Sequence, residues 1–347
     1  MRMTMPYQKI LVIKTRAIGD TVIWTSALAK LRKAYPHAEI HALTYGMNKD
    51  ILLNSQLINK LHLVDAKSKS DFVKKLWQLR KEKFDLLLGF HVSGSLCKFA
   101  WLTGAKEIVL HHHSLHRTPF LSSKKVPHAG DLEDAITRDY RVLEAIGLDP
   151  EHELTKIDLS PEEAEFAQSL THEKIVAAGG DPDKKRFIFL PGASYSLKIY
   201  PKDLWVEVVK KIKSEGHYQP LILCDQKISK EWNLPELAKE LGVPLIDDVS
   251  LRKFIALIST GSVTLSNDSS PGHISVALGV RTHFLFGPAC IGDWFCYDKN
   301  LHTYHRVDVP CRIQGPRDRE QFQFCTVTEC SHHSCMRKIK LLDIQNW

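Results

Sequence analysis

The sequence predicts an α/β protein built from two doubly wound domains. Short apolar segments of strand length alternate with helical segments along most of the chain, which is typical of parallel sheets with helical crossovers. The predicted strands are almost continuously apolar, as strands are when helices cover both faces of their sheet. The chain has 347 residues, more than one hydrophobic core usually serves, so two domains are expected.

The first half of the chain alternates strands and helices. Strands are expected at 10–13, 40–43, 61–64, 84–88 and 108–110, and helices at 21–34, 71–81 and 131–146. The first of these helices carries Val22, Ile23, Ala27 and Leu31 at helical spacing. The last one ends at Gly147, a typical C-terminal stop.

A polar, irregular stretch at 148–160 separates the two halves. It contains Pro150, and the pair Ser160-Pro161 has the pattern that begins a helix. We therefore expect an N-terminal domain of residues 1–155 and a C-terminal domain of residues 156–347.

The second half repeats the alternation. Strands are expected at 186–190, 221–223, 245–246, 263–265 and 283–286, and helices at 201–213, 234–241, 251–258 and 274–278. Beyond Gly287 the sequence is less regular. A short terminal helix is expected at about 336–347, packing back on the N-terminal domain.

Polar loops follow three of these strands. In open parallel sheets, ligands bind beyond the carboxyl ends of the strands, so we expect the site in a cleft between the two domains. The first loop, 15–20, ends in Gly19 and Asp20. Gly19 allows a tight turn, and the dipole of the following helix favours the anionic form of Asp20, which suits a general base. The alternative is an ordinary N-cap aspartate.

The second loop, 191–201, follows the strand at 186–190. Gly192 permits close backbone approach, Ser194 and Ser196 offer hydroxyl groups, and Lys198 is a mobile charge suited to a phosphate. The alternative for Lys198 is a solvated surface lysine.

The third loop is the corner at 265–273, where a strand, small polar residues and a helix start meet. Free backbone N–H groups and the positive helix end make such a corner a site for a diphosphate. Ser269 and Ser270 supply hydroxyls at the capping position, and we expect the His273 imidazole to face the anion. The alternative is an ordinary N-capped corner.

Several other classes of site are absent from the sequence. It has no G-x-G-x-x-G after the first strand, no G-x-x-x-x-G-K-[ST] and no G-x-S-x-G, which argues against dinucleotide, P-loop and serine-hydrolase chemistry. The histidines at 111–113 and His116 suit only adventitious metal binding.

The charge distribution indicates an anionic partner. Residues 1–130 hold 21 Lys and Arg against 8 Asp and Glu, a charge of +13, and the remainder carries −6. The alternative for the lysine-rich run at 67–83 is a solvated helix face. Nucleic acid is not expected, because interleaved aromatic residues are lacking. No signal peptide or apolar run of about 20 residues is present, so we expect a cytoplasmic protein.

Six of the eight cysteines lie in the last sixty residues. The run Cys325-x4-Cys330-x4-Cys335, with His332 and His333 inside it, has the residue types of a zinc site but lacks a C-x2-C knuckle. Buried free thiols are the favoured interpretation, and no metal site is predicted.

Taken together, these segments resemble the lipopolysaccharide heptosyltransferase family, glycosyltransferase family 9. The resemblance rests on LVIKTRAIGD at 11–20, SYSLKIYP at 194–201, SNDSSPGH at 266–273, ALG at 277–279 and LFGP at 285–288. The cysteine-containing tail up to Met336 is also similar. The match covers essentially the whole chain.

The resemblance implies the glycosyltransferase-B architecture of two Rossmann-like domains. The basic N-terminal domain would bind the acceptor and the C-terminal domain the nucleotide sugar. It further implies inverting transfer of heptose from ADP-heptose to the lipid A–Kdo inner core of lipopolysaccharide, with no metal or other cofactor. The partners would be the nucleotide sugar and an anionic glycolipid at the cytoplasmic face of the inner membrane.

The resemblance also assigns roles to residues. Asp20 corresponds to the catalytic base, and Arg16 and Gly19 lie on the acceptor side. The donor-binding residues would be Ser194, Lys198, Asp268, Ser269, Ser270 and His273.

The chain departs from the family at Ser270, where the family usually has glycine. A serine there narrows the sugar pocket or adds a hydrogen bond, so a family member that uses another nucleotide sugar or acceptor stays open as an alternative. A second alternative rests on the basic N-terminal half and the C-terminal cysteines: a non-catalytic module that binds an anionic ligand and carries a C-terminal metal site.

Overall fold

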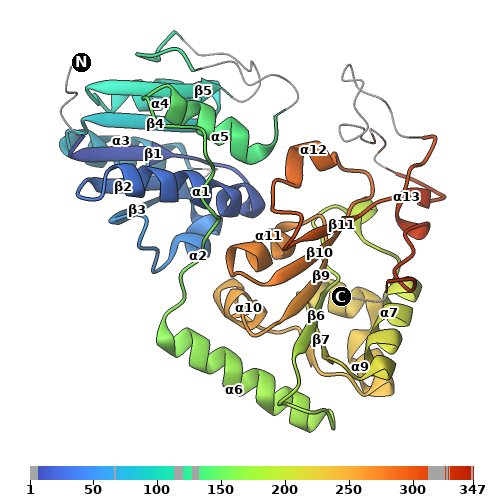
Figure 1. Cartoon of the computed structure of the whole chain (residues 1–347). Coiled ribbons are helices and arrows are strands. Elements are labelled where there is room, and N and C mark those ends of the chain that lie inside the picture. The colour runs from blue at the N-terminus through green and yellow to red at the C-terminus, as the bar shows by residue number, and fades with distance from the viewer. Residues whose placement is uncertain are drawn as a thin grey trace. The chain divides into compact units, whose positions relative to one another are not determined.

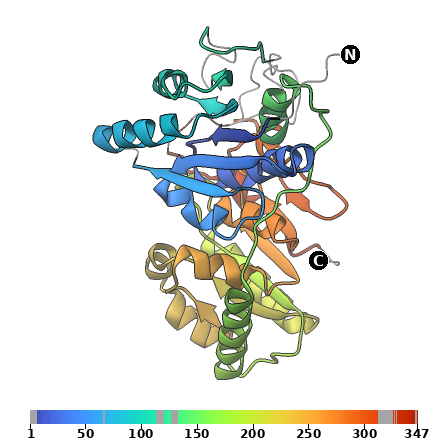
Figure 2. The same cartoon turned by 90° about the vertical axis from the view of Figure 1, so that its left-hand side faces the viewer.

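The structure is a computed structural model that describes residues 7–65, 68–112, 120–126, 133–311, 325, 327, 329–344 and 347. The chain divides into two compact units, Met1–Asp158 and Leu159–Trp347 (Figure 1). The division falls after Asp158, within the stretch predicted to be a linker and three residues beyond the expected boundary after residue 155. This stretch runs without helix or strand from the first unit into a long helix (green in Figure 2).

The first unit contains a parallel sheet with the strand order β3-β2-β1-β4-β5. Its strands are β1 (Lys9–Ile13), β2 (Glu39–Tyr45), β3 (Lys60–Val64), β4 (Leu86–Val92) and β5 (Glu107–His112). The chain moves outward from β1 to β3 and then returns to place β4 on the other side of β1. The point where the strand order reverses therefore lies between β1 and β4.

The helices of the first unit connect these strands. They are α1 (Ile18–Ala34), η1 (Gly46–Asn48), α2 (Lys49–Leu52), α3 (Lys69–Lys81), α4 (Gly94–Leu102) and α5 (Ala135–Glu144). The side chains of Ser68, Ser93 and Asp134 accept backbone N–H bonds at the starts of α3, α4 and α5. The expected start of the last helix, at residue 131, lies outside the described residues.

Helix α1 begins earlier than predicted. Ala17 has extended backbone, and the Thr21 amide donates to the Ala17 carbonyl at 3.1 Å, which closes the first helical turn over Gly19 and Asp20. The predicted tight turn at Gly19 is therefore wrong. Asp20 is not the N-cap residue but lies within the first turn of the helix.

The second unit contains a parallel sheet with the strand order β11-β10-β9-β6-β7-β8. Its strands are β6 (Arg186–Leu190), β7 (Gln219–Leu223), β8 (Leu245–Ile246), β9 (Val263–Asn267), β10 (Arg281–Leu285) and β11 (Thr303–His305). Here the strand order reverses between β6 and β9.

The helices of the second unit include the long α6 that follows the linker. They are α6 (Pro161–Ala177), η2 (Ser196–Lys198), α7 (Lys202–Glu215), α8 (Gln226–Trp232), α9 (Leu234–Leu241), α10 (Leu251–Ile258), α11 (Ser270–Ala277), α12 (Ile291–Trp294) and α13 (Ser334–Arg337). The capping box of Ser160 and Glu163 begins α6. None of the helices in the described part of the chain has the length and hydrophobicity that a bilayer crossing requires.

The terminal helix predicted at 336–347 does not form. Helix α13 ends at Arg337, and the carbonyl groups that a longer helix would use are taken by side chains. Tyr200 donates to the Ile339 carbonyl at 2.8 Å, and Lys211 donates to the carbonyls of Leu342 and Ile344 at 2.6 Å.

The tail also packs elsewhere than predicted. Ile339, Leu341 and Trp347 are buried in the core of the second unit, with Phe187 and Phe189 of its central strand β6. The expectation that this segment packs on the N-terminal domain is therefore corrected: it belongs to the hydrophobic core that supports β6.

Candidate functional site

Polar side chains gather at the carboxyl ends of both sheets, next to the point where each strand order reverses. In open parallel sheets this is where a crevice forms between neighbouring loops that leave in opposite directions. In the first unit the residues follow β1 and lie at the end of β4. In the second unit they follow β6 and β9. The two clusters are described separately below.

The centre of the second unit's cluster is an ion pair between Lys198 and Asp268. The Lys198 ammonium lies 2.6 Å from a carboxylate oxygen of Asp268, whose side chain is 3% exposed. The Asp268 amide donates to the Leu285 carbonyl of β10 at 3.1 Å, which fixes its backbone. A buried carboxylate on a rigid strand end thus positions a partly exposed ammonium group.

Asn267, which the sequence argument did not single out, joins the two loops. Its side-chain nitrogen donates to the Pro191 carbonyl at 2.7 Å, and its oxygen accepts from the Tyr200 amide at 3.0 Å. One buried amide therefore ties both ends of the loop that carries Lys198. The available signal was an amide side chain at the carboxyl end of a predicted strand, in the stretch Val263–Asn267.

The start of helix α11 differs from those of α3, α4 and α5 in how its N-cap side chain is bonded. Ser269 occupies the N-cap position, as predicted, but its hydroxyl donates to the carbonyls of Gly192 and Asn267 at 3.1 and 3.3 Å. In the described part of the chain, no side chain caps the N-terminus of α11. Ser270 is the first helical residue and is half-buried. The positive end of α11 therefore lies beside Lys198's partner Asp268.

Gly272 and His273 attach α11 to the sheet. A Cβ atom on Gly272 would lie 2.4 Å from the Phe284 ring, so only glycine permits this approach. His273 is 4% exposed, and its Nδ1 lies 2.5 Å from the Tyr297 hydroxyl, with the Phe284 ring alongside. The structure therefore places His273 in an aromatic cluster that supports the start of α11. Ser194 lies exposed on the loop between β6 and η2.

In the first unit, Arg16 and Asp20 lie together where β1 leads into α1. Arg16 Nε is 3.8 Å from a carboxylate oxygen of Asp20, whose side chain is 12% exposed. The buried Asn48 donates to the Arg16 carbonyl and to the Thr44 hydroxyl, both at 2.9 Å, and so holds this loop. The first turn of α1 places the positive end of a helix dipole beside Asp20.

A buried ion pair that sequence reasoning missed lies in the same unit. Lys14 Nζ is 2.5 Å from Asp139 Oδ2, and both side chains are almost fully buried. Burial raises the pKa of Asp139, the charge of Lys14 opposes that rise, and the negative charge of Asp20 reinforces it. The available signals were a lysine directly after the apolar strand β1 and an aspartate on the apolar face of α5, between Ile136 and Tyr140.

His91, which was also missed, completes this cluster from β4. Its φ of +54° lies in the left-handed region, and the β4–β5 register shifts between Gly89 and Val92. The His91 ring stacks on His111 at 5.6 Å. Burial lowers the pKa of His91 to about 2, helped by the positive charges of Lys14, Arg138 and Arg16. His91 is therefore a neutral imidazole. Two of the histidines that were expected to bind metal only adventitiously, His113 and His116, lie outside the described residues.

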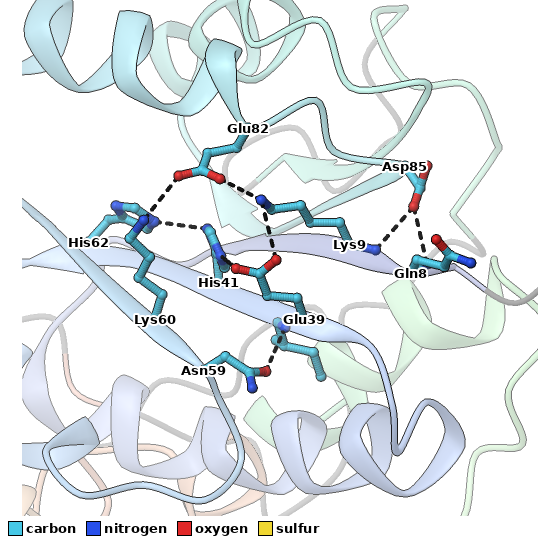
Figure 3. A network of polar contacts seen from close by, with 10 residues as sticks. Gln8, Lys9, Glu39, His41, Asn59, Lys60, His62, Glu82 and Asp85 are labelled. Atoms are coloured by element: carbon cyan, nitrogen blue, oxygen red, sulfur yellow. Dashed lines mark hydrogen bonds and ion pairs between the residues drawn. The ribbon is translucent and has the colours of Figure 1, made fainter.

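A third polar cluster lies at the opposite, amino ends of β1, β2 and β3 (Figure 3). Ligand atoms of Glu39, His41 and Glu82 lie within 4.8 Å of one another. However, Lys9 contacts Glu39 at 3.3 Å and hydrogen-bonds to Glu82, which Lys60 also contacts at 3.0 Å. Ammonium groups already neutralise both carboxylates, so this cluster is an ion-pair network rather than a metal centre.

Comparison with known proteins gives a consistent family match. The family model of glycosyltransferase family 9 (heptosyltransferase) matches residues 73–315. Lipopolysaccharide heptosyltransferase 3 of Escherichia coli is 22% identical, over 89% of this chain and 92% of the relative. Lipopolysaccharide heptosyltransferase 1 of Campylobacter coli is 23% identical, over 92% of this chain and 95% of the relative.

Solved structures show the same fold. The ADP-heptose LPS heptosyltransferase II of E. coli has a TM-score of 0.71 at 18% identity, covering 87% of this chain and 91% of that one. A family 9 glycosyltransferase from Veillonella parvula has a TM-score of 0.72 at 21% identity, covering 83% of each chain. The expected glycosyltransferase-B architecture of two Rossmann-like domains is thereby confirmed.

Proposed function

This chain belongs to glycosyltransferase family 9 and is a glycosyltransferase enzyme, and from that premise we propose that it transfers heptose from ADP-heptose to the lipid A–Kdo inner core of lipopolysaccharide. The observation that carries the proposal is the pair of polar clusters at the strand-order reversals of both units. One offers a carboxylate beside cationic groups, and the other offers an ammonium group beside an uncapped helix start. These are the groups that a hydroxyl acceptor and a diphosphate donor require.

On the donor side, Lys198 and α11 bind the diphosphate of ADP-heptose. The Lys198 ammonium exchanges part of its contact with Asp268 for a phosphate oxygen, and the positive end of the α11 dipole stabilises the remaining phosphate charge. Ser194 and Ser270 add hydroxyl donors. Ser269 and His273 hold the corner in shape through Gly192 and Tyr297.

In the transfer step, Asp20 acts as the general base. It removes the proton from the acceptor hydroxyl as the oxygen attacks the anomeric carbon, and the bond from that carbon to the diphosphate breaks on the opposite face. The configuration at the anomeric carbon is therefore inverted, and ADP leaves. Negative charge grows on the leaving diphosphate, and Lys198 with the positive end of α11 stabilises it without a metal ion or other cofactor.

On the acceptor side, Arg16 is placed to pair with an anionic group of the glycolipid. Gly19 leaves the first turn of α1 without a side chain next to Asp20. The charge of +13 over residues 1–130 suits an anionic glycolipid at the cytoplasmic face of the inner membrane.

Thermal unfolding in the presence of nucleotides tests the donor assignment. ADP and ADP-heptose are expected to raise the melting temperature, because a ligand that binds only the folded state stabilises it. The rise in melting temperature should be larger with ADP-heptose and ADP than with UDP and GDP derivatives. A larger rise in melting temperature with a UDP- or GDP-sugar would show that the donor is another nucleotide sugar. Ser270, which stands where the family usually has glycine, is the reason to test this alternative.

The variant Asp20→Asn tests the base assignment. Asparagine keeps the size of the side chain but cannot accept the proton, so transfer should fall by about 10²- to 10⁴-fold. The melting-temperature shift with ADP should stay unchanged, because Asp20 is not on the donor side. Near-normal turnover of Asp20→Asn would contradict the assignment.

A further inference from the structure

Large hydrophobic side chains are exposed on two neighbouring helices of the first unit, α3 and α4. Trp77 of α3 is 61% exposed, and Val73, one turn earlier on the same side of the helix, is more than half exposed. Trp101 and Leu102 at the end of α4 are exposed as well. Single apolar side chains on a surface are ordinary, but several on adjacent elements mark a surface that binds a partner.

Contacts between α3 and α4 bring these side chains into one region. The Phe72 and Phe99 rings meet edge to face at 5.8 Å, and the Arg80 guanidinium donates to the Leu102 carbonyl at 2.6 Å. Both helices pack on the same hydrophobic core cluster and so cover the same face of the sheet (Figure 2). We call their outer surface the α3–α4 face, and its exposed apolar residues are Val73, Trp77, Trp101 and Leu102.

Lysine side chains accompany the apolar residues of the α3–α4 face. Lys74 and Lys81 of α3 and Lys98 of α4 are all exposed. The acidic residues of α3 and of the turn after it are engaged elsewhere. Asp71 accepts a backbone amide at 2.8 Å, and Glu82 is paired with two other lysines. The α3–α4 face is therefore both apolar and positively charged.

An anionic lipid bilayer fits this combination. Tryptophan is favoured at the membrane–water interface, because its ring is apolar while its N–H group stays hydrated. Lysine ammonium groups close to a bilayer are attracted to anionic headgroups. A second copy of the chain fits less well, because a two-fold contact through this face would place the lysines of both copies against one another.

We propose that the α3–α4 face docks the protein on an anionic bilayer. Trp77 and Trp101 lie at the level of the headgroups, and Lys74, Lys81 and Lys98 contact the headgroup phosphates. The inference deepens the proposed function, on which it rests for the reason to approach a membrane: it names the surface through which a lipid-linked acceptor is reached. Docking itself requires neither donor nor acceptor, so it can be tested apart from the transfer reaction.

Sedimentation of the full chain with lipid vesicles tests the docking surface. One set of vesicles contains phosphatidylcholine alone, and the other contains equal parts of phosphatidylcholine and phosphatidylglycerol. Binding to the mixed vesicles should be tighter by about 10-fold or more, and it should weaken as salt is added, because salt screens the attraction. Equal binding to both kinds of vesicle, or no binding to the mixed ones, would overturn the proposal even if the enzyme transfers heptose.

A double variant locates the apolar part of the contact. Val73→Ser with Trp77→Ser should lower the affinity for mixed vesicles by about 10-fold, because these side chains carry apolar area into the interface. The matched control is Val176→Ser with Leu301→Ser in the second unit, where Val176 is as exposed as Val73, at 54%. The control should bind like the unaltered chain. The rise in melting temperature with ADP should be the same in both variants, which shows that each is folded. Unchanged vesicle affinity in the folded Val73→Ser, Trp77→Ser variant would contradict the assignment.

A second pair of variants tests the charges. Lys74→Gln with Lys81→Gln should weaken binding to mixed vesicles by about 10-fold and leave binding to phosphatidylcholine unchanged. Lys227→Gln with Lys230→Gln, which removes two exposed lysines of α8, should bind like the unaltered chain. An equal loss of binding in both pairs would show that overall charge, rather than the α3–α4 face, attracts the vesicles.

Sedimentation equilibrium without lipid tests a second copy as the occupant. The unaltered chain and the Val73→Ser, Trp77→Ser variant should have the same mass in solution. A dimer of the unaltered chain that this variant dissociates would overturn the proposal, because the α3–α4 face would then be covered by another copy of the protein.

Discussion

Lys198 is the residue on which the proposed donor site most depends. Its ammonium is partly exposed, but its partner Asp268 is almost fully buried. Exposed ion pairs contribute little to stability. In this pair, by contrast, a buried carboxylate holds the cation at a helix start. The pair is therefore better explained as a device that positions the Lys198 ammonium than as one that stabilises the fold.

Replacement of Lys198 should therefore affect turnover more than folding. Lys198→Ala should lower kcat by about 10²- to 10³-fold, because the leaving diphosphate loses a cation in the transition state. Lys198→Arg should retain part of the activity. Steady-state kinetics with ADP-heptose measures both, and an unchanged kcat in Lys198→Ala would contradict the role.

The residues that sequence reasoning missed share a physical reason. Lys14 and Asp139 form an ion pair across 125 positions of sequence, and His91 has a low pKa because it is buried, with nearby positive charges adding to the effect. Local patterns can mark Lys14 and Asp139 as unusual residues, but they do not show that the two are partners, because only folding brings them together. Asp268 and Ser269 could be found because they directly follow the predicted strand β9, and Lys198 because it lies in the loop that follows β6 at the same carboxyl edge of the sheet.

At the scale of elements, apolar runs predicted the strands and capping patterns predicted many helix limits. The predicted strands 186–190 and 245–246 and the helices 234–241 and 251–258 agree with β6, β8, α9 and α10. Strand β11 was missed because Thr303–His305 is short and only half-buried. The terminal helix was wrong because tertiary hydrogen bonds to its carbonyls outweigh local helix preference.

The approach of α11 to β10 depends on Gly272. Gly272→Ala should lower the free energy of unfolding by about 1–3 kcal/mol, because the added methyl group overlaps the Phe284 ring and overpacks the interface. Gly46→Ala is the control, since no atom lies within 4 Å of its added Cβ. Urea unfolding measures both. Equal stability of Gly272→Ala and the unaltered chain would show that the helix does not need this close approach.

The network of Figure 3 makes the first unit sensitive to acid. His62 is buried with Nε2 at 3.0 Å from His41 Nδ1. Burial lowers the pKa of His62 to about 4, and the charges of His41, Lys75 and Lys60 add to the effect. The unfolded chain has a pKa near the ordinary value of 6.5. His62 therefore stabilises the fold fully above about pH 6.5, and that stability is lost as the pH falls towards 4.

Between pH 7 and pH 4, this one histidine should remove up to about 3 kcal/mol from the free energy of unfolding. His62→Leu, which cannot be protonated, should show a smaller loss over the same range. Urea unfolding at several pH values compares the two chains. The same pH dependence in both would refute the assignment to His62.

For the molecule as a whole, the proposed function assigns the acceptor to one unit and the donor to the other, and both units have the same architecture. Each sheet reverses its strand order once, and each places its reactive side chains at that reversal. The charge of +13 in residues 1–130 against −6 in the remainder suits a division into an acceptor unit and a donor unit.

Incubation of the protein with ADP-heptose and Kdo-lipid A, followed by mass spectrometry of the lipid product, tests the central claim most directly. The account predicts a product heavier by one heptosyl unit, formed with stoichiometric release of ADP and absent with Asp20→Asn. An unchanged acceptor under these conditions, together with transfer from a different nucleotide sugar or to a different acceptor, would contradict it.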